Sequence, residues 1–126
     1  MYNKKIIEYF RKPRNVGEIK DADGVGKIKS PVCGDLMHVY IKVGNDSVGG
    51  EIIKDCKVVT FGCIAAVATA SSMTEMAIGK PIEEAHKITS RIIADDLGGL
   101  PEEKFHCTNL AVQGLKRAID DYRKKK

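Results

Sequence analysis

The spacing of hydrophobic residues along the chain changes first near residue 20. In the first segment, Tyr2, Ile6 and Phe10 recur at helical spacing, which predicts a helix over residues 2–12 that Pro13 ends. From about residue 25 the hydrophobic residues alternate with polar ones, which is typical of half-buried strands. The alternation and the turns between the runs predict three strands, at residues 25–29, 36–43 and about 50–60.

The second half of the chain has the composition of helices. A stretch rich in Ala and Met runs to a stop signal, Gly-Lys-Pro, at residues 79–81. Farther on, Ala85, Ile88 and Ile92 are spaced so that they form one apolar stripe of a second helix. The helices expected here cover residues 63–78, about 83–97, and 107 to about 123.

Strands followed by helices indicate an α+β protein. We expect a three-stranded antiparallel sheet, joined as a meander by short turns, with the N-terminal helix and the C-terminal helices packed on one face. A chain of 126 residues can bury a hydrophobic core without disulfides, so we expect a single domain over residues 1–126.

Composition and charge narrow the class of function. Hydrophobic residues make up 43% and charged residues 30% of the chain, as in soluble folded proteins. There is no apolar run of about 18 residues and no secretory signal in the sequence, so we expect a cytoplasmic protein that does not bind membranes. The net charge of +4 comes largely from cations near the termini, without nucleic-acid-binding motifs, so nucleic acid is not an expected partner.

Three of the four cysteines lie where the expected secondary structure changes. Cys33 lies in the turn between the first two strands, and Cys63 follows the third strand, which runs back toward that turn, so the two should be neighbours. Cys63 and Cys107 each begin an expected helix, where unpaired N–H groups and the helix dipole favour thiolate. In a reducing compartment this set indicates a shared metal site. Cys56, inside the third strand, is expected to be an ordinary core thiol.

Two further candidate ligands lie beside these cysteines. Asp35 is separated from Cys33 by one glycine; it is either an ordinary turn aspartate or a hard carboxylate ligand of the same metal. His106 precedes Cys107, and at an irregular helix start the two side chains can reach the same ion. A carboxylate is a poorer ligand than thiolate for an iron-sulfur centre, so Asp35 would make one corner of the site weak.

The residues alone leave two other classes of protein open. Cys33, Cys63, Cys107 and either His106 or Asp35 could close a structural zinc tetrahedron, although the paired, short-spaced cysteines typical of such sites are missing. A thiol enzyme that acts through Cys107, with His106 as its base, is disfavoured because adjacent residues rarely form a hydrogen-bonded nucleophile and base.

Several motifs taken together resemble the IscU/NifU-N type iron-sulfur cluster assembly scaffolds nearly from end to end. They are KPRNVG at 12–17, PVCGDLM at 31–37, TFGC at 60–63, Lys104 with His106-Cys107, and LKRAIDDY at 115–122. The resemblance implies an IscU/SufE-like fold. It also implies roles for five residues: cluster ligation by Cys33, Cys63 and Cys107, persulfide acceptance by Cys107, a labilising carboxylate at Asp35 and an alternative nitrogen ligand at His106.

The same resemblance implies a scaffold protein and not an enzyme. A labile [2Fe-2S] cluster is assembled from iron and from sulfur supplied by a cysteine desulfurase, with an electron donor such as ferredoxin, and is then transferred to apo-proteins. Zinc commonly binds the same ligands when iron is absent. A homodimer is left open.

The chain departs from the pattern of the resembled family beside the cysteines. Residues 100–104 read LPEEK where many members read Leu-Pro-Pro-Val-Lys, which argues against recognition by a dedicated Hsp70 chaperone. Ile64-Ala65 replaces the usual Gly-Ser after Cys63, which changes packing beside the cluster. The interval from Cys63 to Cys107 carries no insertion, which argues against the zinc-using SufU-type relatives.

Overall fold

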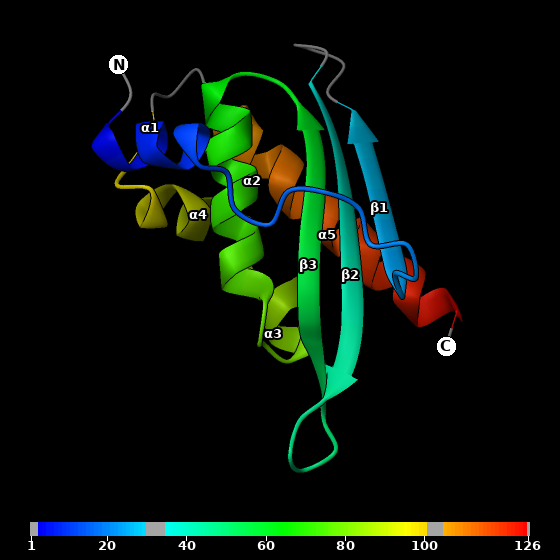
Figure 1. Cartoon of the computed structure of the whole chain (residues 1–126). Coiled ribbons are helices and arrows are strands. Elements are labelled where there is room, and N and C mark those ends of the chain that lie inside the picture. Colours follow the sequence, from blue (N-terminus) through cyan, green and yellow to red (C-terminus); the bar gives the residue numbers. More distant parts are fainter. Residues whose placement is uncertain (1–2, 30–34, 101–104, 126) are drawn as a thin grey trace.

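The computed structural model describes residues 3–29, 35–100 and 105–125, the last range without the side chains of residues 105 and 106. This part of the chain forms a three-stranded sheet and five helices (Figure 1). In chain order the elements are α1 (Lys4–Arg11), β1 (Gly24–Lys29), β2 (Leu36–Asn45), β3 (Glu51–Phe61), α2 (Ile64–Ala77), α3 (Ile82–His86), α4 (Ser90–Asp96) and α5 (Phe105–Lys125).

The sheet is an antiparallel meander in the order β1-β2-β3, as the alternating pattern predicted. Lys29 and Phe61 both pair with Leu36, so the end of β1, the start of β2 and the end of β3 lie at one end of the sheet. A bulge between Lys42 and Val43 shifts the register toward the other end. The expected α+β fold is confirmed.

The core lies between the sheet and the helices that cover one of its faces. Figure 1 shows α5 crossing behind the sheet, while the segment between α1 and β1 crosses in front. Met37, Val39 and Ile41 alternate along β2, are each 0% exposed, and belong to one core cluster with residues of α2 and α5. Cys56 of β3 is also 0% exposed in this cluster, so the expectation of a core thiol is confirmed.

Small residues allow α5 to lie directly against β1. A Cβ atom added to Gly26 would lie 2.2 Å from the carbonyl oxygen of Gly114, far inside the distance at which atoms can pack. The two backbones are therefore in contact. Asp121 of α5 reinforces this contact because its carboxylate accepts a hydrogen bond of 2.9 Å from the backbone N–H of Val25.

The helix expected at about residues 83–97 is two shorter helices, so that prediction was wrong. Ile88 lies between α3 and α4 and is buried at 4% exposure. Thr89 is the N-cap of α4, and its hydroxyl accepts a hydrogen bond of 3.3 Å from the backbone N–H of Ile92. A new helix thus begins at a side-chain cap where one helix was expected to continue. Its orientation leaves Ile92 47% exposed, outside the expected apolar stripe.

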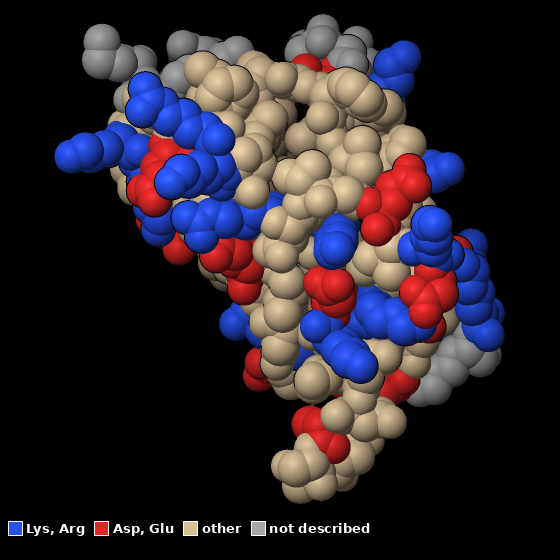
Figure 2. Space-filling view, viewed as in Figure 1, with Lys and Arg blue, Asp and Glu red and all other residues tan. Residues whose placement is uncertain are grey.

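Charged side chains are unevenly distributed over the face seen in Figure 2. Lys and Arg gather over α1, whereas positive and negative groups are interspersed over the sheet. Lys42 of β2, for example, lies 3.1 Å from a carboxylate oxygen of Asp21 and 3.7 Å from one of Asp23. Among the described residues, no helix is long and apolar enough to cross a membrane.

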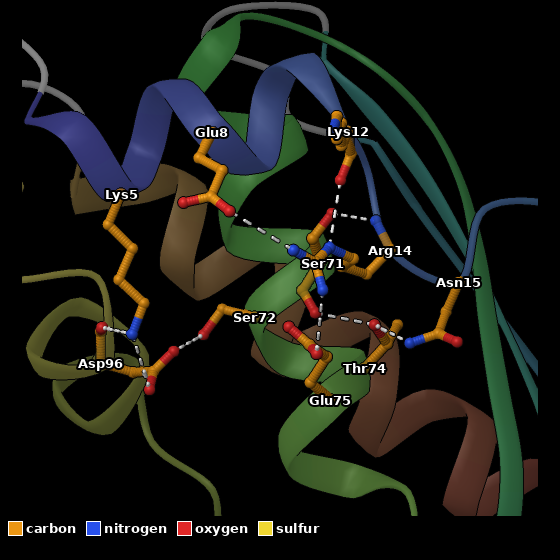
Figure 3. A network of polar contacts seen from close by, with 10 residues as sticks. All are labelled: Lys5, Glu8, Lys12, Arg14, Asn15, Ser71, Ser72, Thr74, Glu75 and Asp96. Atoms are coloured by element: carbon orange, nitrogen blue, oxygen red, sulfur yellow. Dashed lines mark hydrogen bonds and ion pairs between the residues drawn. The ribbon is translucent and has the colours of Figure 1, made fainter.

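Polar contacts hold the segment after α1 against α2 (Figure 3). The backbone N–H of Arg14 donates a hydrogen bond of 3.1 Å to Ser71 Oγ, and Asn15 Nδ2 donates one of 3.0 Å to Thr74 Oγ1. Ser71 and Thr74 are nearly or fully buried in α2, so these bonds satisfy polar groups that would otherwise be costly to bury. They fix the segment over the face of α2.

The same network extends from α2 to α4 and back to α1 (Figure 3). Ser72, which is 0% exposed, donates a hydrogen bond of 2.7 Å to Asp96 Oδ2 at the end of α4. The ammonium group of Lys5 lies 3.4 Å from the other carboxylate oxygen of Asp96. These contacts connect α2 to α4 and α4 to α1, so both α1 and α4 help to hold α2 in place.

Candidate functional site

The end of the sheet at which β2 starts and β3 ends is also where α2 begins (Figure 1). Because Leu36 pairs with Phe61, Asp35 just before β2 and Cys63 just after β3 lie at the same place. The expected return of the third strand toward the turn before the second is therefore confirmed for Asp35 and Cys63. Cys33 lies outside the described residues, so its expected contact with Cys63 stays a prediction.

Cys63 is the N-cap residue of α2. Its backbone is extended, with φ −76° and ψ 178°, and its side chain makes no capping hydrogen bond. The sulfur is therefore not used to cap the helix. It lies 3.7 Å from the sulfur of Cys107, the second cysteine of the site. The positive end of the helix dipole lies beside it and favours a negative charge there.

Cys107 lies in the first turn of α5, which begins at Phe105, two residues before the expected start. It is 0% exposed and packs with Ala65 and Ala66 of α2. Thr69, one turn farther along α2, donates its hydroxyl to the carbonyl oxygens of Ala66 at 3.0 Å and Cys107 at 3.4 Å. Thr69 thus supports the site, although no pattern in the sequence pointed to it.

The side chains of Asp35, Cys63 and Cys107 come together in space. One ligand atom from each lies within 4.8 Å of the others, and the two Sγ atoms are 3.7 Å apart. Two thiolates bound to one tetrahedral metal at about 2.3 Å are separated by about 3.8 Å, so the observed sulfur separation suits a shared ion. Among the described residues, this is the one group of three such side chains whose ligand atoms are that close.

Two predicted site residues, Cys33 and His106, lie wholly or partly outside the described part of the structure. His106 lies in the first turn of α5 next to Cys107, but its side chain is outside the described part of the structure, as are Cys33 and Lys104. The described site therefore consists of two sulfurs and one carboxylate. That donor set combines soft and hard ligands, and it can bind zinc or iron.

The fourth cysteine, Cys56, has a different environment from the two sulfurs of the site. Burial in the sheet, with a smaller effect from Asp55, raises the pKa of its thiol from 9.0 to about 12. It does not belong to the group of close ligand atoms. A neutral, buried thiol of this kind is a poor metal ligand.

Comparison with known proteins gives one family for the whole chain. The family model described as NifU-like N terminal domain matches residues 1–126. The iron-sulfur cluster assembly scaffold protein IscU 1 of Archaeoglobus fulgidus is 57% identical over 125 residues, which cover 99% of this chain and 78% of that protein. The scaffold protein IscU of Rickettsia prowazekii is 44% identical over 128 residues, covering 99% of this chain and 94% of that protein.

Solved structures share the fold at lower sequence identity. A nitrogen-fixing NifU-like protein (N-terminal) from Brucella abortus superposes with a TM-score of 0.73 at 21% identity, covering 98% of this chain and 95% of that one. An iron-sulfur cluster assembly scaffold protein for the SUF system from Fervidobacterium islandicum gives 0.70 at 23% identity, covering 94% and 96%. At these identities the match concerns the fold alone.

Proposed function

Because the chain belongs to the NifU-like N-terminal domain family, we propose that it is a scaffold on which an iron-sulfur cluster is assembled, with Asp35, Cys63 and Cys107 among the cluster ligands. The observation that carries the proposal is the convergence of these three ligand atoms to within 4.8 Å. Relatives 44% and 57% identical to the chain carry the name of iron-sulfur cluster assembly scaffolds. The protein is a carrier and not an enzyme.

The cluster is of the [2Fe-2S] type, with Cys33 as the third thiolate ligand. Three thiolates bind iron strongly, whereas the remaining position is occupied in turn by Asp35, by His106 or by a sulfur of the acceptor protein. A ligand set that is completed by a weak, exchangeable donor allows the cluster to leave without unfolding of the site. Zinc binds to the same ligands when iron is absent.

Cys107 is the acceptor of sulfur from a cysteine desulfurase. Its thiolate attacks the terminal sulfur of the desulfurase persulfide; a new S–S bond forms at Cys107 as the old one breaks, and the desulfurase cysteine leaves as a thiolate. Two electrons from a ferredoxin-type donor then cleave the S–S bond at Cys107 and release sulfide. Cys107 is fully buried and Cys63 half-buried, so the desulfurase must open the surface beside Cys63.

His106 provides a metal ligand while the sulfur of Cys107 is engaged in persulfide transfer. The support for this role is its place next to Cys107 in the first turn of α5. We expect His106→Ala to reduce both the persulfide loading of Cys107 and cluster formation, measured by mass spectrometry and visible absorption. Unchanged loading and cluster yield in this variant would remove the role.

The remaining partners are the apo-proteins that receive the cluster, in the cytoplasm. A dedicated Hsp70 chaperone is not among the expected partners because LPEEK replaces the usual motif at residues 100–104. A second copy of the chain, in a homodimer, is a further partner that could hold the cluster. Nucleic acid and membranes are not proposed as partners.

The competing function is a structural zinc site made by the same ligands. Anaerobic reconstitution with iron and sulfide separates the two, because only a scaffold gives a visible charge-transfer spectrum with stoichiometric iron and sulfide. We expect Cys63→Ala and Cys107→Ala to abolish this spectrum, whereas Cys56→Ala, which removes a buried thiol outside the site, retains it. Tight zinc binding with no cluster formed under any of these conditions would contradict the scaffold function.

A further inference from the structure

We infer that Gly62 is a positioning residue of the site: the space left by its missing side chain is where the Asp35 carboxylate lies. This inference rests on the proposed function, and it explains why a glycine stands between the end of β3 and Cys63. It assigns a role to a residue that does not bind metal itself.

The strand register places Gly62 opposite Asp35. Leu36 of β2 pairs with Phe61 of β3, and this is the last pair of the ladder at that end. One step beyond the pair, in an antiparallel arrangement, Asp35 faces Gly62. Directly opposite residues of antiparallel strands have their side chains on the same face, so the side-chain position of residue 62 coincides with the region that Asp35 occupies.

The available space at Gly62 is already filled by its neighbours. A Cβ atom added there would lie 2.9 Å from Cγ and 3.0 Å from Oδ2 of Asp35, and 2.8 Å from the Cβ of Ala66. Nonbonded carbon atoms pack at about 3.5–4.0 Å, so all three distances are too short. Any larger residue at this position must displace both Asp35 and Ala66.

Backbone conformation does not account for this glycine. Gly62 is not among the residues with a left-handed φ, the conformation that usually makes glycine necessary. The glycines with such a φ lie elsewhere in the described chain: Gly17, Gly49, Gly79, Gly98 and Gly99. What Gly62 contributes is therefore space beside Asp35 and not an unusual turn.

Of the two neighbours, Asp35 is the one whose side chain can rotate away. Ala66 is 0% exposed and packs in α2 with Ala65 and Cys107, and its methyl group has no rotamer to change. The Asp35 side chain can rotate about two bonds. A methyl group at position 62 therefore turns the carboxylate away from the sulfurs. The 2.8 Å contact with the Ala66 methyl group is relieved separately, by combining Gly62→Ala with Ala66→Gly.

The test compares Gly62→Ala with Asp35→Ala and with the double variant. Zinc affinity, measured by competition with a chromophoric chelator, is expected to fall about 10–100-fold in each single variant, the usual effect of disturbing a ligand or its support. Cobalt(II) absorption is expected to keep its thiolate charge-transfer bands and to show the same altered ligand-field bands in both. Because Gly62 acts through Asp35, adding Gly62→Ala to Asp35→Ala should cause no further loss.

Two additional variants make the outcome specific. Gly44→Ala is the matched control, because Gly44 of β2 also lacks a left-handed φ, and its added Cβ would be at an ordinary 3.4 Å from the Lys54 side chain. It should leave zinc affinity unchanged. If Gly62→Ala does not fold, the double variant Gly62→Ala/Ala66→Gly removes the contact with the helix and keeps the one with Asp35, so the same loss of affinity is expected.

The inference and the proposed function fail on different results. Unchanged zinc affinity in Gly62→Ala or in Asp35→Ala, or a further loss in the double variant relative to Asp35→Ala, would overturn the role of Gly62 even if the wild-type protein assembles a cluster. Absence of a cluster in the reconstituted wild-type protein would overturn the scaffold function, while the zinc and cobalt measurements would still decide the role of Gly62.

Discussion

At the scale of single residues, the chemistry depends on differences between side chains of the same type. Cys63 and Cys107 lie at two helix starts with their sulfurs 3.7 Å apart, whereas Cys56 lies in the sheet with a raised pKa. Asp35 is likewise set apart from the other aspartates by two sulfurs within 4.8 Å. Position in the fold, and not residue type, decides which of these side chains can bind metal.

Replacement of Asp35 is expected to slow the loss of the cluster. A hard carboxylate is a weak ligand for an iron-sulfur centre, so Asp35→Ala removes the exchangeable corner of the site. The decay of visible absorption and the rate of transfer to an apo-ferredoxin should both decrease. Asp95→Ala, at an exposed aspartate of α4, is the control and should behave like the wild type. Faster decay in Asp35→Ala would mean that the carboxylate stabilises the cluster.

The thiol of Cys56 is expected to resist alkylation in the native protein. Its pKa of about 12 keeps it neutral at pH 8, and burial blocks access, so iodoacetamide should modify Cys63 well before Cys56 in the metal-free protein. The raised pKa also makes protein stability depend on pH. Keeping the Cys56 thiol neutral costs no stability below about pH 9, whereas the free energy of unfolding falls as the pH rises from 9 toward 12. If site-resolved mass spectrometry found equal alkylation rates for Cys56 and Cys63, the expected resistance of Cys56 would be contradicted.

At the scale of elements, the contact between α5 and β1 holds one of the two helix starts in place. The helix lies on glycine-containing backbone and is fixed by the hydrogen bond from Val25 to Asp121. The strands and the first helix follow from local periodicity and the second helix from its composition, and their predicted positions agree with the structure to within a few residues. The split near Thr89 was missed because a cap and a continued helix have similar local sequences.

Asp121 is expected to stabilise the protein at neutral pH and to lose this contribution progressively in acid, below the ordinary pKa of an aspartate. The hydrogen bond from the Val25 backbone, followed by the one from Lys125, lowers the pKa of its carboxyl group below 3.8. A lowered pKa contributes stability above the unfolded-state value, and the contribution is lost as the pH falls through the folded-state value. Asp121→Ala should therefore lower the free energy of unfolding by about 1–3 kcal/mol at pH 7, because the Val25 N–H loses its partner.

Urea unfolding at pH 7 and at pH 2.5 measures this effect. The difference between Asp121→Ala and the wild-type protein should be smaller at the lower pH. Asp120→Ala is the neighbouring control. The Asp120 side chain is 59% exposed, and within the described part of the chain its polar contact is with the His86 ring. An equal loss of stability in both variants would show that the hydrogen bond between Val25 and Asp121 contributes nothing specific to the free energy of unfolding.

At the scale of the whole molecule, the site joins segments that are distant in the chain. Its ligands come from the residue before β2, from the N-cap of α2 and from the first turn of α5, and α2 is itself held by contacts to α1 and α4 (Figure 3). Metal binding thus adds a further link between elements that packing and a few hydrogen bonds already connect. The apo-protein and the metal-bound protein should differ in stability more than in fold.

Zinc is expected to raise the melting temperature of the protein. A ligand that binds only the folded state, present at 100 times its dissociation constant, adds about 2.7 kcal/mol to the free energy of unfolding. Thermal melts followed by circular dichroism, with zinc and with EDTA, measure the difference. Cys56→Ala should show the same shift as the wild type and Cys63→Ala a much smaller one. An equal shift in both variants would place the bound zinc elsewhere.

The sequence by itself determined most of the elements and the residue types of the site, but not the division between α3 and α4. Strand and helix periodicity depends on near neighbours in the chain, and so do the positions of Cys63 and Cys107 at element boundaries. From the meander alone, Asp35 and Cys63 could be placed at the same end of the sheet.

Only the tertiary structure decided the distances that matter for chemistry. The sulfurs of Cys63 and Cys107, 44 residues apart in the chain, meet at 3.7 Å because α5 packs on β1 and α2 packs on β3. The space at Gly62 that receives Asp35 likewise depends on a helix and a strand meeting at one point. Such separations are set by packing between distant segments, which local patterns do not encode.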